Sequence, residues 1–202
     1  MQKIFIALIF LGISGIGFWW GGYTFSSHNP KENQATSHVP IGGPFRLKNL
    51  HGELIDSRTL KDKVLAIYFG YSYCPDICPT ALSNLSKALQ ILDKDAERIS
   101  PFFITVDPKR DTQEILSAYM QTFDPKIQAL LGTEDEISFI KKEFRVYAEK
   151  SSTSGDEDDK GYLVDHSSLI YLVKPDGQYL GHFSHDTPPE EMAQRIRELI
   201  VF

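Results

Sequence analysis

The two cysteines of this chain lie in one short segment, FGYSYCPDICP at residues 69–79. Three residues separate Cys74 from Cys78, so in a helical turn their sulfurs face the same side and can share a metal ion or join in a disulfide. The segment precedes a helical pattern, and a position near a helix N-terminus lowers the pKa of a thiol. A disulfide that closes so short a loop removes little chain entropy and stabilises a fold weakly. The spacing therefore favours redox or metal chemistry over a purely structural disulfide.

A metal site built on two thiolates needs further donors. Soft sulfur ligands select Cu(I) or zinc, and a third donor is normally an imidazole. His166 follows Asp165 in the segment GYLVDHSS, directly before an expected strand, and loops at strand ends surround the functional crevice of α/β sheets. Taken alone, such a histidine is more often a hydrogen-bonded structural residue, and Asp165 either orients its ring or belongs to a turn. The other five histidines lie in a polar N-terminal segment, an early turn or the far end of an expected hairpin: His28, His38, His51, His182 and His185.

Alternating strand and helix patterns surround these residues. The run VLAIYF at residues 64–69 predicts a strand buried on both faces, and leucines at helical spacing predict a helix over residues 79–96. Strand–helix–strand–helix order, followed by a hairpin through Pro175-Asp176-Gly177 and a terminal helix, predicts an α/β sandwich. The other predicted elements are a strand at 102–106, hairpin strands at 168–173 and 179–183, and helices at 111–123, 133–144 and 188–201.

The composition excludes several classes of protein. With a net charge of −6, the chain lacks the concentrated Lys and Arg surface that nucleic-acid binding needs. Two cysteines are too few for a disulfide-stapled miniprotein, a zinc ribbon or a four-thiolate cluster. Thirteen Phe and nine Tyr are incompatible with a chain that is disordered throughout. For the acidic stretch SSTSGDEDDK, residues 151–160, we expect a solvated surface loop.

Residues 1–25 predict a single membrane anchor. Residues 4–25 are 22 consecutive residues without a charge, and as a helix they would span about 33 Å, enough for a hydrocarbon core of ~30 Å. Lys3 precedes the run and the next basic residue is Lys31, which favours a cytoplasmic N-terminus and an exported domain. The alternative is a cleaved signal peptide, whose apolar region is normally shorter and ends in a small-residue cleavage site. Residues 26–40 predict a flexible tether, and residues 41–202 a globular domain.

Three motifs in the same order resemble the Sco/SenC family of membrane-anchored copper proteins. They are FGYSYCPDICP at 69–79, TVDPKRDT at 105–112, and VDHSS at 164–168, the last followed by a strand and Pro-Asp-Gly. The resemblance extends over residues 42–201, and the anchor and tether agree with it. It implies a thioredoxin-like α/β fold behind one transmembrane helix. It also implies a role in delivering copper to the dinuclear CuA centre of a cytochrome c oxidase subunit.

The resemblance also implies a ligand set. In the family the two motif cysteines and the histidine of the VDH motif bind copper, which corresponds to Cys74, Cys78 and His166 here and to one copper ion per chain. Many members have His where this chain has Tyr73, but that position is not a ligand. For the motif at residues 107–111 we expect a role in local structure or partner contact. A Cys₂His set suits Cu(I), and imidazole also suits Cu(II).

Two other functions are compatible with the same residues. In the first, Cys74 and Cys78 are a redox-active pair that reduces partner disulfides, although thioredoxin-type reductants usually carry Cys-x-x-Cys. In the second, the protein senses copper or assists assembly without transferring the metal. The N-terminus lacks an Arg- and Ser-rich transit segment, which favours a bacterial inner membrane with the domain in the periplasm. A mitochondrial inner membrane, with the domain facing the intermembrane space, is the alternative.

Overall fold

The computed structural model describes residues 40–151 and 162–200 of the chain. The predicted anchor at residues 4–25, most of the tether and nearly all of the acidic stretch at 151–160 lie outside these residues. Within the described ranges, no helix has the length and apolar character needed to cross a bilayer.

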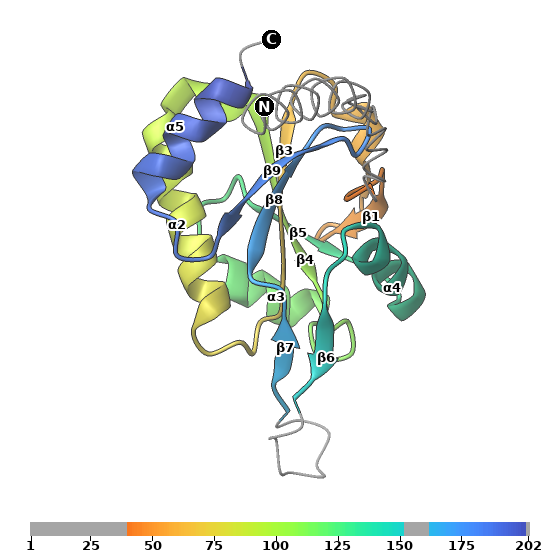
Figure 1. Ribbon diagram of the computed structural model, residues 1–202. Coiled ribbons are helices and arrows are strands. Elements are labelled where there is room, and N and C mark those ends of the chain that lie inside the picture. Colours follow the sequence, from red (N-terminus) through yellow and green to blue (C-terminus); the bar gives the residue numbers. More distant parts are fainter. Residues whose placement is uncertain (1–39, 152–161, 201–202) are drawn as a thin grey trace, which may run out of the picture. The chain divides into compact units, whose positions relative to one another are not determined.

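A seven-stranded mixed sheet forms the centre of the domain (Figure 1). Its strand order is β2-β1-β5-β4-β3-β8-β9, with β3, β4 and β5 parallel to one another and the remaining pairs antiparallel. A separate two-stranded sheet pairs β6 with β7. The strands are β1 (Arg46–Asn49), β2 (Leu54–Asp56), β3 (Val64–Gly70), β4 (Ile99–Thr105), β5 (Gln128–Leu131), β6 (Ala148–Lys150), β7 (Val164–His166), β8 (Leu169–Val173) and β9 (Tyr179–Ser184).

Helices cover both faces of the large sheet. Figure 1 shows α2 and α5 packed together on one side and α4 on the other. The helices are α2 (Ile77–Leu92), α3 (Gln113–Met120), α4 (Glu134–Glu143) and α5 (Pro189–Leu199), with short 3₁₀ helices at Ser57–Thr59 and Asp93–Arg98. The α/β sandwich expected from the order of strand and helix patterns is therefore present.

The apolar sequences of β3 and β4 explain why these strands lie at the centre of the sheet. All seven residues of β3 and all seven of β4 are buried, because these strands lie side by side in the middle of the sheet with helices on both faces. On one face, Phe69 packs against Phe144 and Tyr171. On the other, Phe103 lies between Tyr68 and Tyr119. The ends of these strands therefore provide a rigid base for the loops that follow them.

Helix boundaries differ from the predicted ones for local reasons. α2 begins at Ile77, two residues before the predicted start at Pro79, and ends at Leu92 rather than near Ala96. At its end Asp93 adopts a left-handed φ of 50°, which a continuing α-helix does not allow, and a 3₁₀ helix follows. The helix predicted at 133–144 is confirmed as α4, and its N-cap Thr133 forms a capping box with Glu136.

Five short strands were not predicted. β1, β2, β5, β6 and β7 have three or four residues each, which is too short for an alternating pattern to stand out. β7 matters most for function, because it ends at His166 in what the sequence indicated to be a loop. Its pairing places His166 opposite Ala148 of β6.

Candidate metal centre

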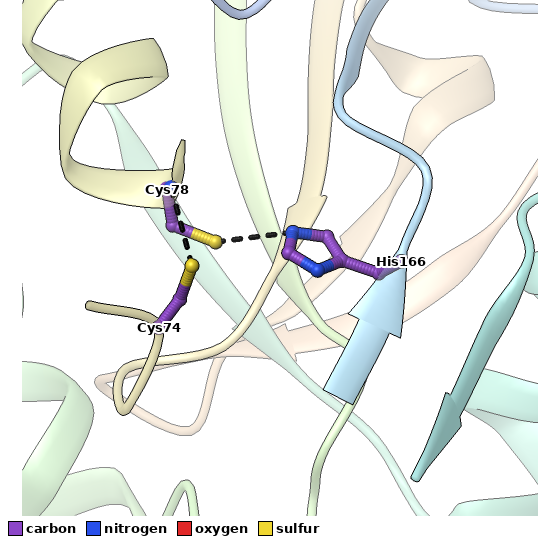
Figure 2. A group of neighbouring side chains, drawn as sticks. All are labelled: Cys74, Cys78 and His166. Atoms are coloured by element: carbon purple, nitrogen blue, oxygen red, sulfur yellow. Dashed lines mark hydrogen bonds between the residues drawn. The ribbon is translucent and has the colours of Figure 1, made fainter. Parts of the chain in front are cut away.

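The fold brings Cys74, Cys78 and His166 together at the end of β3 (Figure 2). Cys74 lies in the turn between β3 and α2, Cys78 is the second residue of α2, and His166 is the last residue of β7. Their possible ligand atoms all lie within 4.8 Å of one another. The Sγ atom of Cys78 is 3.2 Å from Nε2 of His166. Among the described residues, this is the one group of three or more His, Cys, Asp or Glu side chains placed to hold a metal ion.

The turn and the first residues of α2 position the two sulfurs. Cys74 lies outside the helix, so the sulfurs do not converge through helical spacing as expected. Instead, the backbone N–H of Cys74 donates to the carbonyl oxygen of Tyr71 at 3.3 Å, which curls the chain back toward the helix. The backbone N–H of Cys78, one of the N–H groups left free at a helix start, then donates to Sγ of Cys74 at 3.4 Å.

Gly70 makes room for this arrangement, a role that the sequence analysis did not identify. A Cβ atom at Gly70 would lie 2.8 Å from Sγ of Cys78 and 2.9 Å from ring carbons of both Phe103 and Tyr68. These neighbours are fully buried, so a shift of any of them disturbs the packed core. A side chain at this position would therefore push Cys78 away from the strand end.

The surroundings of the two thiols shift their pKa values in opposite directions. The hydrogen bond with the side chain of Cys78 lowers the pKa of Cys74 to about 5, with help from backbone N–H groups and the nearby His166 and against the effect of burial. Burial in apolar surroundings, reinforced by the neighbouring Cys74, raises the pKa of Cys78 well above its usual range. At neutral pH the pair therefore holds one thiolate, on Cys74, and one thiol.

Backbone and aromatic contacts orient the imidazole of His166. Its Nδ1 lies 3.1 Å from the carbonyl oxygen of Val164, so Nδ1 carries the proton and Nε2 faces the sulfurs. The carbonyl group, rather than the exposed side chain of Asp165, therefore fixes the ring. Tyr68 and Tyr71 pack edge-on against the imidazole. The Tyr68 hydroxyl is also 3.5 Å from both Sγ of Cys78 and Nε2 of His166.

A buried carboxylate ties the cysteine turn to the sheet. Asp111 accepts hydrogen bonds from the backbone N–H and the hydroxyl of Ser72, two residues before Cys74, and from the hydroxyl of Thr105 at the end of β4. Its side chain is buried, and burial raises its pKa. The role in local structure expected for the motif at residues 107–111 therefore holds for Asp111.

The remaining histidines that the structure describes lie elsewhere. His51 is in the turn after β1, His182 is on β9 beside the hydroxyl of Tyr179, and His185 follows β9. Tyr73, whose side chain is half exposed, is not part of the group either. His28 and His38 lie outside the described residues.

Two sulfur donors and one imidazole nitrogen form a soft, three-donor set. Such a set suits Cu(I), and the imidazole makes Cu(II) acceptable as well. A structural zinc site would need a fourth protein ligand, and no other His, Cys, Asp or Glu in residues 40–151 and 162–200 joins this group. The side chains present therefore fit a copper ion better than a structural zinc ion.

Solved structures similar to this fold include copper proteins. The structure of ScoI from Bradyrhizobium japonicum with copper bound matches with a TM-score of 0.70 and 40% identity, over 78% of this chain and 98% of that one. Yeast Sco1 with copper bound matches with a TM-score of 0.71 and 36% identity, over 81% and 90% of the two chains. The expected thioredoxin-like α/β architecture is confirmed by this similarity.

Sequence comparison gives the same result over nearly the whole described domain. A SCO2-like protein of Rickettsia conorii is 43% identical over 160 residues, which cover 79% of this chain and 77% of that protein. The mitochondrial protein SCO2 of Saccharomyces cerevisiae is 39% identical over 170 residues, which cover 83% of this chain and 56% of that protein. The SCO1/SenC family model matches residues 33–201, a range that contains Cys74, Cys78 and His166, and the chain therefore belongs to the SCO1/SenC family.

Proposed function

We propose that the protein binds one copper ion through Cys74, Cys78 and His166 and delivers it to the CuA site of cytochrome c oxidase. The observation that carries this proposal is the convergence of the three ligand atoms within 4.8 Å, on elements far apart in the sequence. Two of the similar solved structures, from Bradyrhizobium japonicum and yeast, hold copper. The role in CuA maturation is supported by membership of the SCO1/SenC family.

The state of the thiols suits uptake and release of the metal. Cys74 is already a thiolate at neutral pH, so it can form the first bond to copper without losing a proton. Cys78 must lose its proton as it binds, because the metal ligand is the thiolate. Nδ1 of His166 is bonded to the backbone, so Nε2 is the imidazole nitrogen left to bind the metal. Of the two cysteines, Cys78 is therefore the one that releases a proton when copper binds.

Copper(I) titration of the reduced full chain tests the ligand set. The wild-type protein should bind one equivalent in competition with a chromogenic Cu(I) chelator. The variants Cys74→Ser, Cys78→Ser and His166→Ala should each lose more than about tenfold in affinity. His182→Ala is the matched control, because it removes an imidazole outside the group. Unchanged stoichiometry and affinity in Cys78→Ser and His166→Ala would refute the assignment.

The alternative function is reduction of partner disulfides. The unequal acidities of the two thiols favour it, since a low-pKa thiol beside a buried partner is typical of dithiol reductants. The Cys74 thiolate would attack a partner disulfide and expel one thiolate. Cys78 would then attack the mixed disulfide, and its proton would pass to a released thiolate, so that two electrons move to the partner.

The role of His166 separates the two functions. Copper delivery needs the imidazole, whereas disulfide exchange needs only Cys74 and Cys78. Cells that carry His166→Ala in place of the wild-type protein should assemble an oxidase without CuA, while the purified variant still reduces disulfides. If such cells assemble a normal CuA centre, the protein acts as a reductase.

We also propose that residues 4–25 anchor the protein in a bacterial inner membrane, with residues 26–40 as a tether and residues 41–202 in the periplasm. Support comes from the charge-free run and from the flanking Lys3 and Lys31. In spheroplasts, external protease should degrade the domain, while the protein sediments with membranes and resists carbonate extraction. A domain protected in spheroplasts and cleaved only after lysis would contradict this topology.

A further inference from the structure

His166 and the cysteines lie on separate parts of the fold. Cys74 and Cys78 follow β3 of the seven-stranded sheet, whereas His166 ends β7, which pairs with β6 in the small sheet. Figure 1 shows β6 and β7 side by side, beyond the end of the central strands. The distance between imidazole and sulfur therefore depends on what holds β7 against the main sheet.

Tyr162, two residues before β7, makes the first of these attachments. Its hydroxyl donates a hydrogen bond of 2.7 Å to Oδ1 of Asp107. Its carbonyl oxygen accepts a hydrogen bond of 2.7 Å from Nη1 of Arg110. The guanidinium carbon of Arg110 also lies 3.5 Å from the centre of the Tyr162 ring. One residue is thus held by its side chain, its backbone and its ring face at once.

The two partners of Tyr162 form a buried ion pair in the loop that follows β4. Nε of Arg110 lies 2.5 Å from Oδ2 of Asp107, and the side chains are only 9% and 6% exposed. The backbone N–H of Asp107 donates to the hydroxyl of Thr105, the last residue of β4. Since β4 pairs with β3 over its whole length, the ion pair is fixed to the same framework as the cysteines.

The span that carries His166 is therefore attached at both ends. Tyr162 lies four residues before His166, and β8 begins at Leu169, three residues after it, in the main sheet. Between these attachments, the backbone N–H of Val164 donates to the hydroxyl of Tyr71 at 3.1 Å. If the first attachment loosens, the histidine gains freedom on its N-terminal side, which lowers the fraction of time that Nε2 faces the sulfurs.

We infer that Asp107, Arg110 and Tyr162 form a positioning cluster that sets copper affinity by holding His166 at the metal centre. The inference rests on the proposed copper function and extends it to residues outside the proposed ligand set. Asp111 follows Arg110 and donates its backbone N–H to the carbonyl oxygen of Asp107, but its side chain holds the cysteine turn instead. The cluster also requires arginine at position 110. Only a planar guanidinium can pair with a carboxylate, donate to a carbonyl oxygen and stack on an aromatic ring at the same time.

Tyr162→Phe in the full chain is the direct test. It removes the hydrogen bond to Asp107 and keeps the ring, and we expect about tenfold weaker Cu(I) binding in competition with a chelator. Tyr147→Phe is the matched control, because the Tyr147 hydroxyl bonds a carboxylate of the same small sheet, Glu149, at an exposed position. It should bind copper as the wild type does. Equal affinity in all three proteins would overturn the inference.

A double-mutant cycle with His166→Ala shows whether the cluster acts through the histidine. If it does, Tyr162→Phe weakens binding in the wild-type background and changes nothing further once His166 is absent. An equal loss in both backgrounds would indicate general destabilisation and contradict the inference. If His166→Ala itself binds copper normally, the proposed ligand set fails, which is a different result.

Spectra of the Cu(II)-loaded protein give a readout that stability alone does not change. The electron paramagnetic resonance spectrum of Tyr162→Phe should contain a component that matches His166→Ala, from molecules whose imidazole has left the metal. Arg110→Lys provides a second variant, since it keeps the charge beside Asp107 but loses the stacked, forked contact with Tyr162. It should show the same component. A wild-type spectrum in both variants would refute the inference.

Discussion

At Gly70, the addition of a single methyl group would disturb the candidate metal centre directly. The substitution Gly70→Ala adds one methyl group, which would lie 2.8 Å from Sγ of Cys78 and 2.9 Å from ring atoms of Phe103 and Tyr68. Ordinary contacts begin near 3.4 Å, so each neighbour must move by about 0.5 Å. All three are fully buried, so the movement disturbs the packed core.

The magnitude follows from these contacts. Overpacking of a well-packed core typically lowers the free energy of unfolding by about 1–3 kcal/mol. Metal affinity should fall as well, because protein ligands are held within about 0.2 Å of their preferred distances and Sγ of Cys78 must shift by more than that. We therefore expect about tenfold weaker Cu(I) binding, which corresponds to ~1.4 kcal/mol.

Urea unfolding of the reduced full chain and Cu(I) competition measure the two effects of Gly70→Ala. The control is Gly52→Ala, where a Cβ meets nothing within 4 Å but φ is +80°. That variant should lose about 1 kcal/mol of stability from backbone strain and no copper affinity. If Gly70→Ala keeps both wild-type stability and wild-type affinity, the close approach of Cys78 to the strand end is not needed for the site.

Three further predictions concern single residues. In the copper-free protein at pH 7, iodoacetamide should modify Cys74 much faster than Cys78, with a rate that falls as the pH drops through about 5, because that is the pKa of Cys74 and the pKa of Cys78 is raised. Mass spectrometry of the labelled peptide checks this, and equal labelling of both would contradict it. Because burial raises the folded-state pKa of Asp111 above 3.8, its contribution to stability is greatest below that pH and is lost as the pH rises through the raised pKa. Urea unfolding over this range should show the decline in the wild type relative to Asp111→Asn, and parallel curves would rule it out. Thr133→Ala breaks the capping box of α4 and should lower the free energy of unfolding by about 1 kcal/mol without changing copper affinity, whereas a loss of affinity would show that α4 is coupled to the site.

The central elements of the fold could be predicted from sequence because their signals are local. The run at residues 64–69 is apolar throughout because β3 is buried on both faces, and Pro175-Asp176-Gly177 forms the turn between β8 and β9. The short strands carry no comparable signal. β7 is three residues long, and its pairing with β6 joins segments on either side of residues 152–161.

The candidate metal centre could also be predicted only in part. The sequence predicts the pairing of Cys74 with Cys78 because both lie in one short segment. The position of His166 depends on contacts across the fold: its place before a strand made it a candidate ligand, and the family resemblance assigned it to the site. The sequence did not indicate the roles of Tyr68 and Tyr162, or that of Gly70 within the first motif. These roles arise from neighbours that only the folded chain brings together.

X-ray absorption spectroscopy of the reduced full chain loaded with one equivalent of Cu(I) tests the copper ligand set most directly. We predict a first coordination shell of two sulfur atoms and one imidazole nitrogen in the wild type, and loss of the imidazole signal in His166→Ala. A wild-type spectrum with sulfur ligands alone, unchanged by His166→Ala, would contradict the copper centre proposed for Cys74, Cys78 and His166.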